Sequence, residues 1–197
     1  MRKFLRQRLN PKVNLSKSEA RKSLKAKIAE FTPDIRLKKS RDVSRNILGF
    51  LNSQNYSSKG IIGGFAPMHD EVEWLLELDE FADRLAFPGT DENGAMIFFQ
   101  TRFDDLIATR VFGVTIKSPK TEASIVVPDL LLVPGLGFSR KGERLGRGKG
   151  FYDKYLENFN GLKIGICTSE QILNEIPTED HDIKMDGLIT DSEVTIF

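Results

Sequence analysis

The sequence is poor in the features that mark secreted and membrane-spanning proteins. Its 197 residues contain one cysteine, Cys167, which excludes an internal disulfide. Cys167 lies in LKIGICT, a segment typical of a buried strand, so we expect an unreactive thiol in the core. No apolar run approaches the roughly 20 residues that cross a bilayer, and we therefore expect no contact with a membrane. A reducing, cytoplasmic setting follows as the expectation.

Histidine is also scarce. His69 and His181 are the only two, and they are too far apart to suggest a metal site, so we expect both in loops. The N-terminal segment MRKFLRQRLNPKVNLSK has no apolar stretch of the kind found in secretory signals. Because this segment is rich in Arg and Lys and contains no acidic residue, an organellar transit segment stays open as an alternative to the cytoplasm.

The small net charge conceals an uneven distribution. Residues 1–50 carry 15 Lys and Arg against 4 Asp and Glu, whereas residues 51–197 carry 14 against 24. A basic N-terminal part can bind nucleic acid, a polyanionic small molecule or the acidic remainder of its own chain. The aromatic residues of this part are Phe4, Phe31 and Phe50, which is poor support for a platform that stacks nucleobases.

Apolar segments that alternate with amphipathic ones predict an α/β fold. Helices are predicted from Ser16 or Ser18 to Phe31, from Pro33 to about Leu51, and over residues 71–84, 151–159 and 169–176. Strands are predicted over residues 61–66, 85–88, 95–99, 130–133, 162–167, 187–190 and 194–197. This order indicates a single three-layer domain, in which a mostly parallel sheet has helices on both faces and a basic helical arm precedes it. The last two strands are expected to form an antiparallel edge.

Local signals support the helix that begins at Pro33. Thr32 is a predicted N-cap, and proline is favoured at the first helical position because it has no N–H to satisfy there. The side chains expected to face the core from this helix are Ile35, Val43, Ile47, Leu48 and Leu51.

One segment, LLLVPGLGFSRKGERLGRGKGFYDKYL, combines an apolar strand with a glycine-rich loop and a helix. Closely spaced glycines let successive backbone N–H groups turn inward as a nest for an anion, and a following helix adds its N-terminal N–H groups. The spacing matches neither the P-loop pattern GxxxxGK(S/T) nor the dinucleotide pattern GxGxxG. We therefore predict a phosphate-binding loop of another kind, with basic side chains from Arg140, Lys141, Arg144, Arg147 and Lys149.

Asp153 lies in the first turn of the helix that follows this loop. Its carboxylate is compatible with two roles, and both stay open on residue type alone. It can complement the positive end of the helix dipole, or it can bind Mg²⁺ beside phosphate groups.

The loop resembles the signature of the 5-formyltetrahydrofolate cyclo-ligase family. PGLGFSRKGERLGRGKGFYDKYL shares with that signature Pro-Gly, a nearby Phe, the run GxRLGxGxG, an aromatic residue and Tyr-Asp. GFAPMHDEVE and SEQILNEIPTEDHDIKMDGLIT resemble two further family segments in the same order, so the resemblance spans roughly residues 21–190. Phe151 stands where the family often has Tyr, so any hydrogen bond from that hydroxyl is lost.

The resemblance implies conversion of 5-formyltetrahydrofolate to 5,10-methenyltetrahydrofolate with ATP and Mg²⁺. It implies folate contacts from Met68 and Glu73, Mg²⁺ ligation by Asp153 and Asp182, and a monomer that does not bind nucleic acid. Arg147 and Lys149 are the expected catalytic residues. The implied ATP-binding residues are Arg21, Lys25, Arg144, Leu145, Gly146, Arg147, Gly148, Lys149, Gly150, Phe151 and Tyr152. Of these, Arg147, Gly148, Lys149, Gly150 and Phe151 are also expected near the folate.

The family's N-terminal KxxxR motif is not literal in this chain. Its favoured placement is on Arg21 and Lys25, which makes residues 1–20 an extension and 21–197 one domain. The rival placement, on Arg2 and Arg6, requires an insertion further along the chain. A spacing of four puts either pair on one helix face. A lysine at position 25 cannot reproduce the bidentate contact of an arginine.

Two other functions are compatible with the same sequence features. Another phosphate-handling α/β enzyme, such as a kinase, would use the glycine-rich loop. A nucleic-acid-binding module would use the basic arm, and its binding would weaken with salt.

Overall fold

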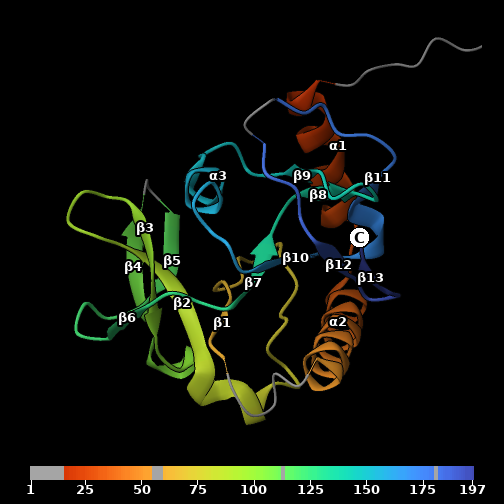
Figure 1. Cartoon of the computed structure of the whole chain (residues 1–197). Coiled ribbons are helices and arrows are strands. Elements are labelled where there is room, and N and C mark those ends of the chain that lie inside the picture. The colour runs from red at the N-terminus through yellow and green to blue at the C-terminus, as the bar shows by residue number, and fades with distance from the viewer. Residues whose placement is uncertain (1–15, 55–59, 112–113, 180–181) are drawn as a thin grey trace, which may run out of the picture.

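The central sheet determines where the glycine-rich loop lies. The computed structural model describes residues 16–54, 60–111, 114–179 and 182–197. Within these residues, an eight-stranded sheet has the strand order β13-β12-β10-β7-β1-β2-β3-β6 (Figure 1). Its strands are β1 (Ile62–Gly63), β2 (Leu85–Thr90), β3 (Met96–Gln100), β6 (Ser124–Val126), β7 (Leu130–Pro134), β10 (Leu162–Ile166), β12 (Gly187–Ile189) and β13 (Val194–Ile196).

The five central strands, from β12 to β2, run parallel. The outer pairs β12–β13, β2–β3 and β3–β6 are antiparallel. The mostly parallel sheet and its antiparallel closing edge are therefore as predicted. The carboxyl ends of parallel strands meet at one edge of a sheet, and this is the edge at which α/β proteins bind ligands.

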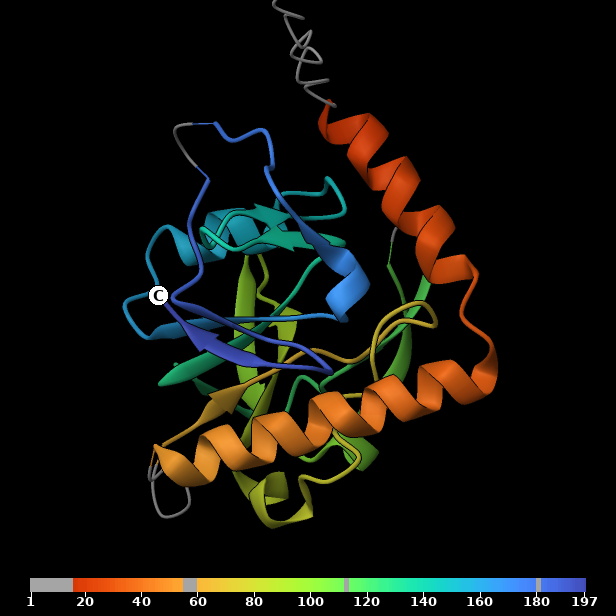
Figure 2. The same cartoon turned by 90° about the vertical axis from the view of Figure 1, so that its right-hand side faces the viewer.

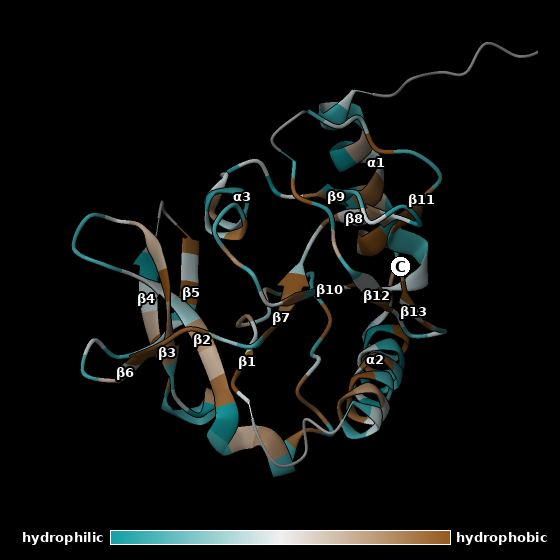
Figure 3. Ribbon diagram, in the orientation of Figure 1, coloured by the Kyte–Doolittle hydropathy of each residue, from teal (hydrophilic) through white to brown (hydrophobic). Residues whose placement is uncertain are grey.

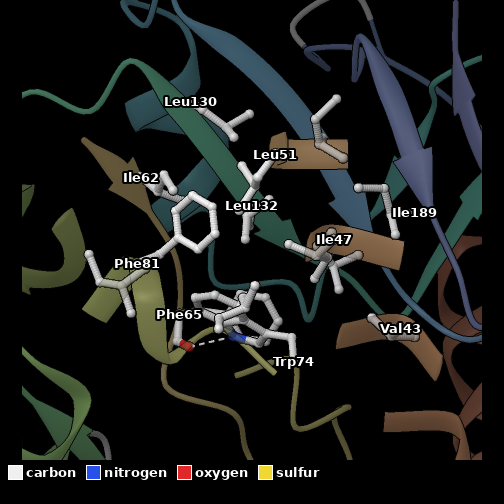
Figure 4. Close-up of a cluster of buried hydrophobic side chains, with 14 of the residues drawn as sticks. Val43, Ile47, Leu51, Ile62, Phe65, Trp74, Phe81, Leu130, Leu132 and Ile189 are labelled. Atoms are coloured by element: carbon white, nitrogen blue, oxygen red, sulfur yellow. Dashed lines mark hydrogen bonds between the residues drawn. The ribbon is translucent and has the colours of Figure 1, made fainter. Parts of the chain in front are cut away.

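Strand β7 is buried on both faces of the sheet. All its leucines and Val133 are buried, as expected for a strand covered on both sides, and Figure 3 shows β7 as strongly hydrophobic. Leu130 and Leu132 join the cluster under α2 (Pro33–Ser53), which Figure 4 shows in detail. Leu131 and Val133 join the cluster under α3 (Phe151–Leu156) on the opposite face. The predicted three-layer arrangement is confirmed.

Helix α1 (Lys17–Ala29) begins with a capping box between Ser16 and Glu19. It packs through Ala20, Leu24 and Ile28 beside a small sheet rather than on the central sheet (Figure 2). This second sheet contains β8 (Gly137–Ser139), β9 (Arg144–Leu145) and β11 (Ile172–Leu173). The expected division between residues 20 and 21 falls inside α1.

Helix α2 begins as predicted, with Thr32 as its N-cap and Pro33 in its first turn. Val43, Ile47 and Leu51 are buried, but the expectation for Ile35 was wrong, because 43% of its surface is exposed. Ile35 lies in the first turn, before the helix reaches the sheet.

The predicted helix over residues 71–84 was wrong for most of its length. Turns lead instead to a 3-10 helix, η1 (Asp79–Arg84). The backbone N–H groups of Glu73 and Glu77 donate to the hydroxyl oxygens of Ser40 and Ser44 on α2, at 3.0 and 2.8 Å. An N–H held by another element cannot form the i→i−4 bond of a helix, and a tertiary contact thus overrides the local periodicity.

The predicted helix over residues 169–176 was also wrong. It is replaced by a 3-10 turn, η3 (Ser169–Gln171), and by β11, which pairs in parallel with β8. The glycine-rich segment itself supplies β8 and β9, which no sequence pattern predicted. The 3-10 turn η2 (Phe103–Asp105) and the hairpin of β4 (Ile107–Val111) and β5 (Val114–Ser118) were also unpredicted. Among the described helices, none has the length and hydropathy needed to cross a membrane.

Close packing at Gly64 gives a test of this fold. A methyl group at Gly64 would lie 2.3 Å from Cζ2 of Trp74, which is fully buried and donates from Nε1 to the Phe65 carbonyl at 2.9 Å. We expect Gly64→Ala to lower the free energy of unfolding by about 1–3 kcal/mol, because the indole must move. Urea denaturation followed by circular dichroism measures the change.

Gly49→Ala is the matched control. Gly49 lies in α2, and a methyl group there meets no atom within 4 Å. This substitution should raise the free energy of unfolding by about 0.5–1 kcal/mol, since alanine has less backbone freedom to lose. Equal effects of the two substitutions would contradict the packing described here.

Candidate functional site

The loop between β9 and α3 has the backbone geometry of an anion-binding turn. Gly148 and Gly150 have φ angles of +91° and +73°, in the left-handed region that favours glycine. Left-handed residues at alternate positions aim backbone N–H groups toward a common point, as in a nest. Gly150 is also the residue that precedes α3, so the loop leads directly into the helix.

Helix α1 holds the start of this loop. The Nε of Arg21 donates to the Gly146 carbonyl oxygen at 2.9 Å, and a methyl group at Gly148 would lie 3.6 Å from the guanidinium carbon of Arg21. Lys25, one helical turn further along, has an exposed side chain. Arg2 and Arg6, the rival pair, lie outside the described residues.

Arg144 lies in the core behind the loop. Its side chain is 9% exposed, its Nε donates to the Pro134 carbonyl at 2.9 Å, and its Nη1 donates to Asp153 Oδ1 at 2.7 Å. Its guanidinium also stacks over the Tyr152 ring at 5.3 Å. Burial lowers the pKa of Arg144, and the Asp153 carboxylate opposes that shift. Arg144 thus joins β7 to the first turn of α3.

Arg147 is held by two acids from the loop that follows β1. Its Nη2 and Nη1 donate to the two carboxylate oxygens of Asp70 at 2.7 and 3.1 Å, and its Nε donates to Glu71 Oε1 at 3.0 Å. Burial alone would lower the pKa of Arg147 and raise that of Asp70. The ion pair outweighs burial for both, so the pKa of Arg147 is raised and that of Asp70 is lowered.

The predicted folate residues lie on the same loop as these acids. The Met68 N–H donates to Glu71 Oε2 at 2.9 Å, and the Glu73 N–H donates to Ser40, while the Glu73 side chain is exposed. The structure therefore brings the segment of Met68 and Glu73 beside Arg147. His69 is exposed in this loop, as expected, and His181 lies outside the described residues.

Lys149 and Phe151 line a groove at the other end of the glycine loop. The groove has a volume of about 610 Å³, and α3, the turn between β2 and β3 and the segment after β6 enclose it. The Lys149 side chain is exposed to solvent. The other lining residues are Asn93, Gly94, Ala95, Met96, Val127, Pro128, Lys154, Tyr155, Asn158, Phe159, Asn160 and Gly161.

Asp153 and Asp182 offer carboxylate oxygens close to Arg144, whose positive charge both acids stabilise. Asp182 accepts hydrogen bonds from Lys17 Nζ and from the Glu179 N–H, each at 2.8 Å. Within the described part of the chain, no three Asp, Glu, His or Cys residues gather as a metal centre. Mg²⁺ commonly uses one or two carboxylates and completes its shell with phosphate oxygens and water, so this donor set fits Mg²⁺.

Two further predicted residues flank this loop, Leu145 in β9 and Tyr152 in α3. Leu145 is buried against α1, so only its backbone can reach a ligand. The Tyr152 hydroxyl is buried without a hydrogen-bond partner among the described residues, and burial raises the pKa of Tyr152. A buried hydroxyl of this kind stays protonated at neutral pH and can donate to a ligand or a water molecule.

Sequence reasoning missed Asp70 and Glu71, the partners of Arg147. Both lie in HDEVE, in the loop after β1, and Glu71 begins the segment that was predicted as a helix. Acidic residues in a loop that follows a buried strand were the available signal, because such loops lie at the ligand-binding edge of an α/β sheet.

Comparison with known proteins supports one family. Residues 13–191 match the sequence profile of the 5-formyltetrahydrofolate cyclo-ligase family. The chain is 28% identical over 203 residues to the 5-formyltetrahydrofolate cyclo-ligase of Mus musculus, covering 90% of this chain and 94% of the mouse protein.

Two solved structures are also similar. The solution structure of 5,10-methenyltetrahydrofolate synthetase from Aquifex aeolicus superposes with a TM-score of 0.75 at 27% identity, covering 91% of this chain and 92% of the other. The 5,10-methenyltetrahydrofolate synthetase from Mycoplasma pneumoniae gives a TM-score of 0.72 at 21% identity, covering 90% and 99%, and supports the shared fold.

The burial of Arg144 gives a prediction that separates it from the exposed basic residues of the same segment. Arg144→Ala removes the hydrogen bond to the Pro134 carbonyl and leaves Asp153 without its cation, so unfolding should become easier by about 1–3 kcal/mol. Arg140 is the control, since its side chain is 64% exposed and pairs with Glu193 at the surface. Arg140→Ala should change the free energy of unfolding by no more than about 0.5 kcal/mol. Equal losses in urea denaturation would show that Arg144 is not a core residue.

Proposed function

The chain belongs to the 5-formyltetrahydrofolate cyclo-ligase family, and from this premise we propose that it converts 5-formyltetrahydrofolate to 5,10-methenyltetrahydrofolate at the expense of ATP. One observation links the proposal to specific residues. The left-handed Gly148 and Gly150 lie in a loop that Arg147 joins to the segment of Met68 and Glu73. This contact supports the proposal, because it joins the proposed phosphate-binding backbone to the proposed folate-binding segment.

The glycine loop is proposed to bind the triphosphate of ATP. Backbone N–H groups of residues 146–150 would donate to phosphate oxygens, and Lys149 would add a mobile positive charge. Arg21 already contacts the Gly146 carbonyl and so lies beside the loop, and Lys25 follows on the same helix. Phosphoryl transfer depends mainly on charge neutralisation and alignment, which these groups can supply without a protein nucleophile.

The proposed reaction begins at the formyl oxygen of the substrate. This oxygen attacks the γ-phosphorus of ATP, a new P–O bond forms, and ADP leaves. N10 of the folate then bonds to the activated formyl carbon and releases its proton to water or to the departing phosphate, which leaves with the former formyl oxygen. Arg147 and Lys149 would stabilise the negative charge that spreads over the transferred group.

Folate binding is proposed for Met68, Glu73 and residues 147–151. A carboxylate such as Glu73 can accept hydrogen bonds from the amino and ring N–H groups of a pterin, and its exposed side chain is available for this. The groove beside Phe151 has the size of a small-molecule site and is partly lined by aromatic side chains.

Mg²⁺ is the proposed metal, with Asp153 and Asp182 as its protein ligands. A bound Mg²⁺ would supply positive charge against the phosphate oxygens. Each acid has a cationic partner, Arg144 for Asp153 and Lys17 for Asp182, which keeps the carboxylates in place. We further propose that the chain acts as a cytoplasmic monomer, with folate and ATP rather than nucleic acid as its partners.

A turnover assay tests the proposed function directly. Purified protein supplied with 5-formyltetrahydrofolate and Mg-ATP should generate the methenyl-folate chromophore, and a chelator of divalent metals should abolish the signal. A kinase-like enzyme would consume ATP with other substrates and give no chromophore. A nucleic-acid-binding module would show salt-sensitive RNA binding and no turnover.

Lys149 should matter for turnover but not for folding. We expect Lys149→Ala to lower kcat/KM by roughly 10²-fold, because a charge that stabilises the transition state is lost from an exposed loop position. Lys120→Ala is the control, since Lys120 is exposed and lies in a turn outside the site. Turnover of Lys149→Ala at the wild-type rate would reject the assignment of this lysine.

The two placements of the N-terminal motif differ in a truncation. Removing residues 1–15 keeps the capping box of α1 and the contact of Arg21 with Gly146. If Arg21 and Lys25 bind the nucleotide, the truncated enzyme should keep its KM for ATP, whereas Arg21→Ala in the full chain should raise it. A large rise in this KM on truncation would instead support Arg2 and Arg6.

A further inference from the structure

Gln171 is a buried polar residue that has no part in the chemistry proposed above. It is the last residue of η3, and only 6% of its surface is exposed. Its amide nitrogen donates to the carbonyl oxygens of Gly135 and Leu136, at 3.1 Å each. Its amide oxygen accepts from the N–H and the hydroxyl of Thr168, at 2.9 and 3.2 Å. All four hydrogen-bonding positions of the amide are therefore used within the protein.

These hydrogen bonds bridge a gap between two stretches of strand pairing. Strand β10 pairs with β7 as far as Pro134, and β11 pairs with β8 from Phe138 onward. Gly135 and Leu136 lie between the two stretches, and both are buried. Buried carbonyl oxygens require a hydrogen-bond donor, and the Gln171 amide supplies it where strand pairing is interrupted.

The turn formed by Gly135 and Leu136 is connected to the start of the glycine loop. The Leu136 N–H donates to the Leu145 carbonyl oxygen at 2.8 Å, and Leu145 directly precedes the loop. The side chains of Leu136 and Leu145 also belong to one buried cluster with α1. Gly135 is closely packed, because a methyl group there would lie 2.6 Å from Cζ of Phe138. A displacement of this turn would therefore displace the residues from which the loop begins.

We infer that Gln171 is a positioning residue, which fixes the turn at Gly135 and Leu136 and thereby places the glycine loop for the nucleotide phosphates. The inference rests on the function proposed above. Gln171 would touch neither ATP nor folate, because its amide is buried and fully hydrogen-bonded. Placement of a binding group in advance lowers the cost of aligning the reactants, and an error of about 1 Å can reduce the rate by roughly 10²-fold.

A purely structural role for Gln171 makes a different prediction. If Gln171 only stabilises the fold, its replacement should make the protein easier to unfold and leave kcat and the KM for ATP of the folded protein unchanged. If Gln171 positions the loop, the folded variant should show a raised KM for ATP or a lowered kcat.

The experiment measures kcat and the KM for ATP in the methenyl-folate assay with the full chain, at a temperature where circular dichroism shows each variant folded. Gln171→Glu keeps the size of the side chain but turns an oxygen instead of a donor toward two carbonyl oxygens. We expect its kcat/KM for ATP to fall by about 10- to 100-fold.

Thr168→Val is a milder variant, and it decides the question if Gln171→Glu does not fold. It keeps the shape of the side chain and removes one of the two hydrogen bonds that the Gln171 amide oxygen accepts. The amide is then held less firmly, and kcat/KM for ATP should fall by about 2- to 5-fold.

Leu51→Ala is the control for a loss of stability alone. Leu51 is fully buried in the main core cluster, which contains neither Gln171 nor a residue of the turn that it holds. This variant should unfold at a lower urea concentration and keep the wild-type kcat/KM for ATP. Wild-type kcat/KM in Gln171→Glu or in Thr168→Val, or an equal loss in Leu51→Ala, would overturn the inference and leave the proposed function standing. A wild-type chain that forms no methenyl-folate would reject both.

Discussion

The ion pair of Arg147 with Asp70 and Glu71 is the interaction on which the geometry of the site depends. It joins the glycine loop, which has little side-chain structure of its own, to a packed segment at the end of β1. The ion pair thus ties the proposed triphosphate site to the proposed folate segment.

The neighbouring basic residues have different contacts and therefore different roles. Arg144 is buried and joins β7 to α3, and Arg21 fixes the Gly146 carbonyl from α1. Lys149 has an exposed side chain at the edge of the groove. The basic residues of this segment therefore differ in role, since Arg144 and Arg147 are held by carboxylates while the Lys149 side chain is exposed. The parallel sheet makes this possible because it brings β1 and β7 side by side, with their carboxyl ends at one edge.

Much of this arrangement could be predicted from local patterns. The apolar run of β7, the caps of α1 and α2 and the glycine loop all follow from residue type and spacing. The segment 71–84 could not be predicted, because Ser40 and Ser44 on a distant helix take the N–H groups that a helix would use. Asp70 and Glu71 escaped notice for the same reason, since their contacts with Arg147 span more than 70 positions. The buried position of Arg144 likewise depends on strand pairing that local patterns do not specify.

The most direct test is a crystal structure of the protein with Mg²⁺ and a non-hydrolysable ATP analogue. The account predicts that the phosphates lie on the backbone of residues 146–150 while Arg147 keeps its contacts with Asp70 and Glu71. Phosphates bound elsewhere, or an Arg147 side chain that has left both acids to reach the nucleotide, would contradict it.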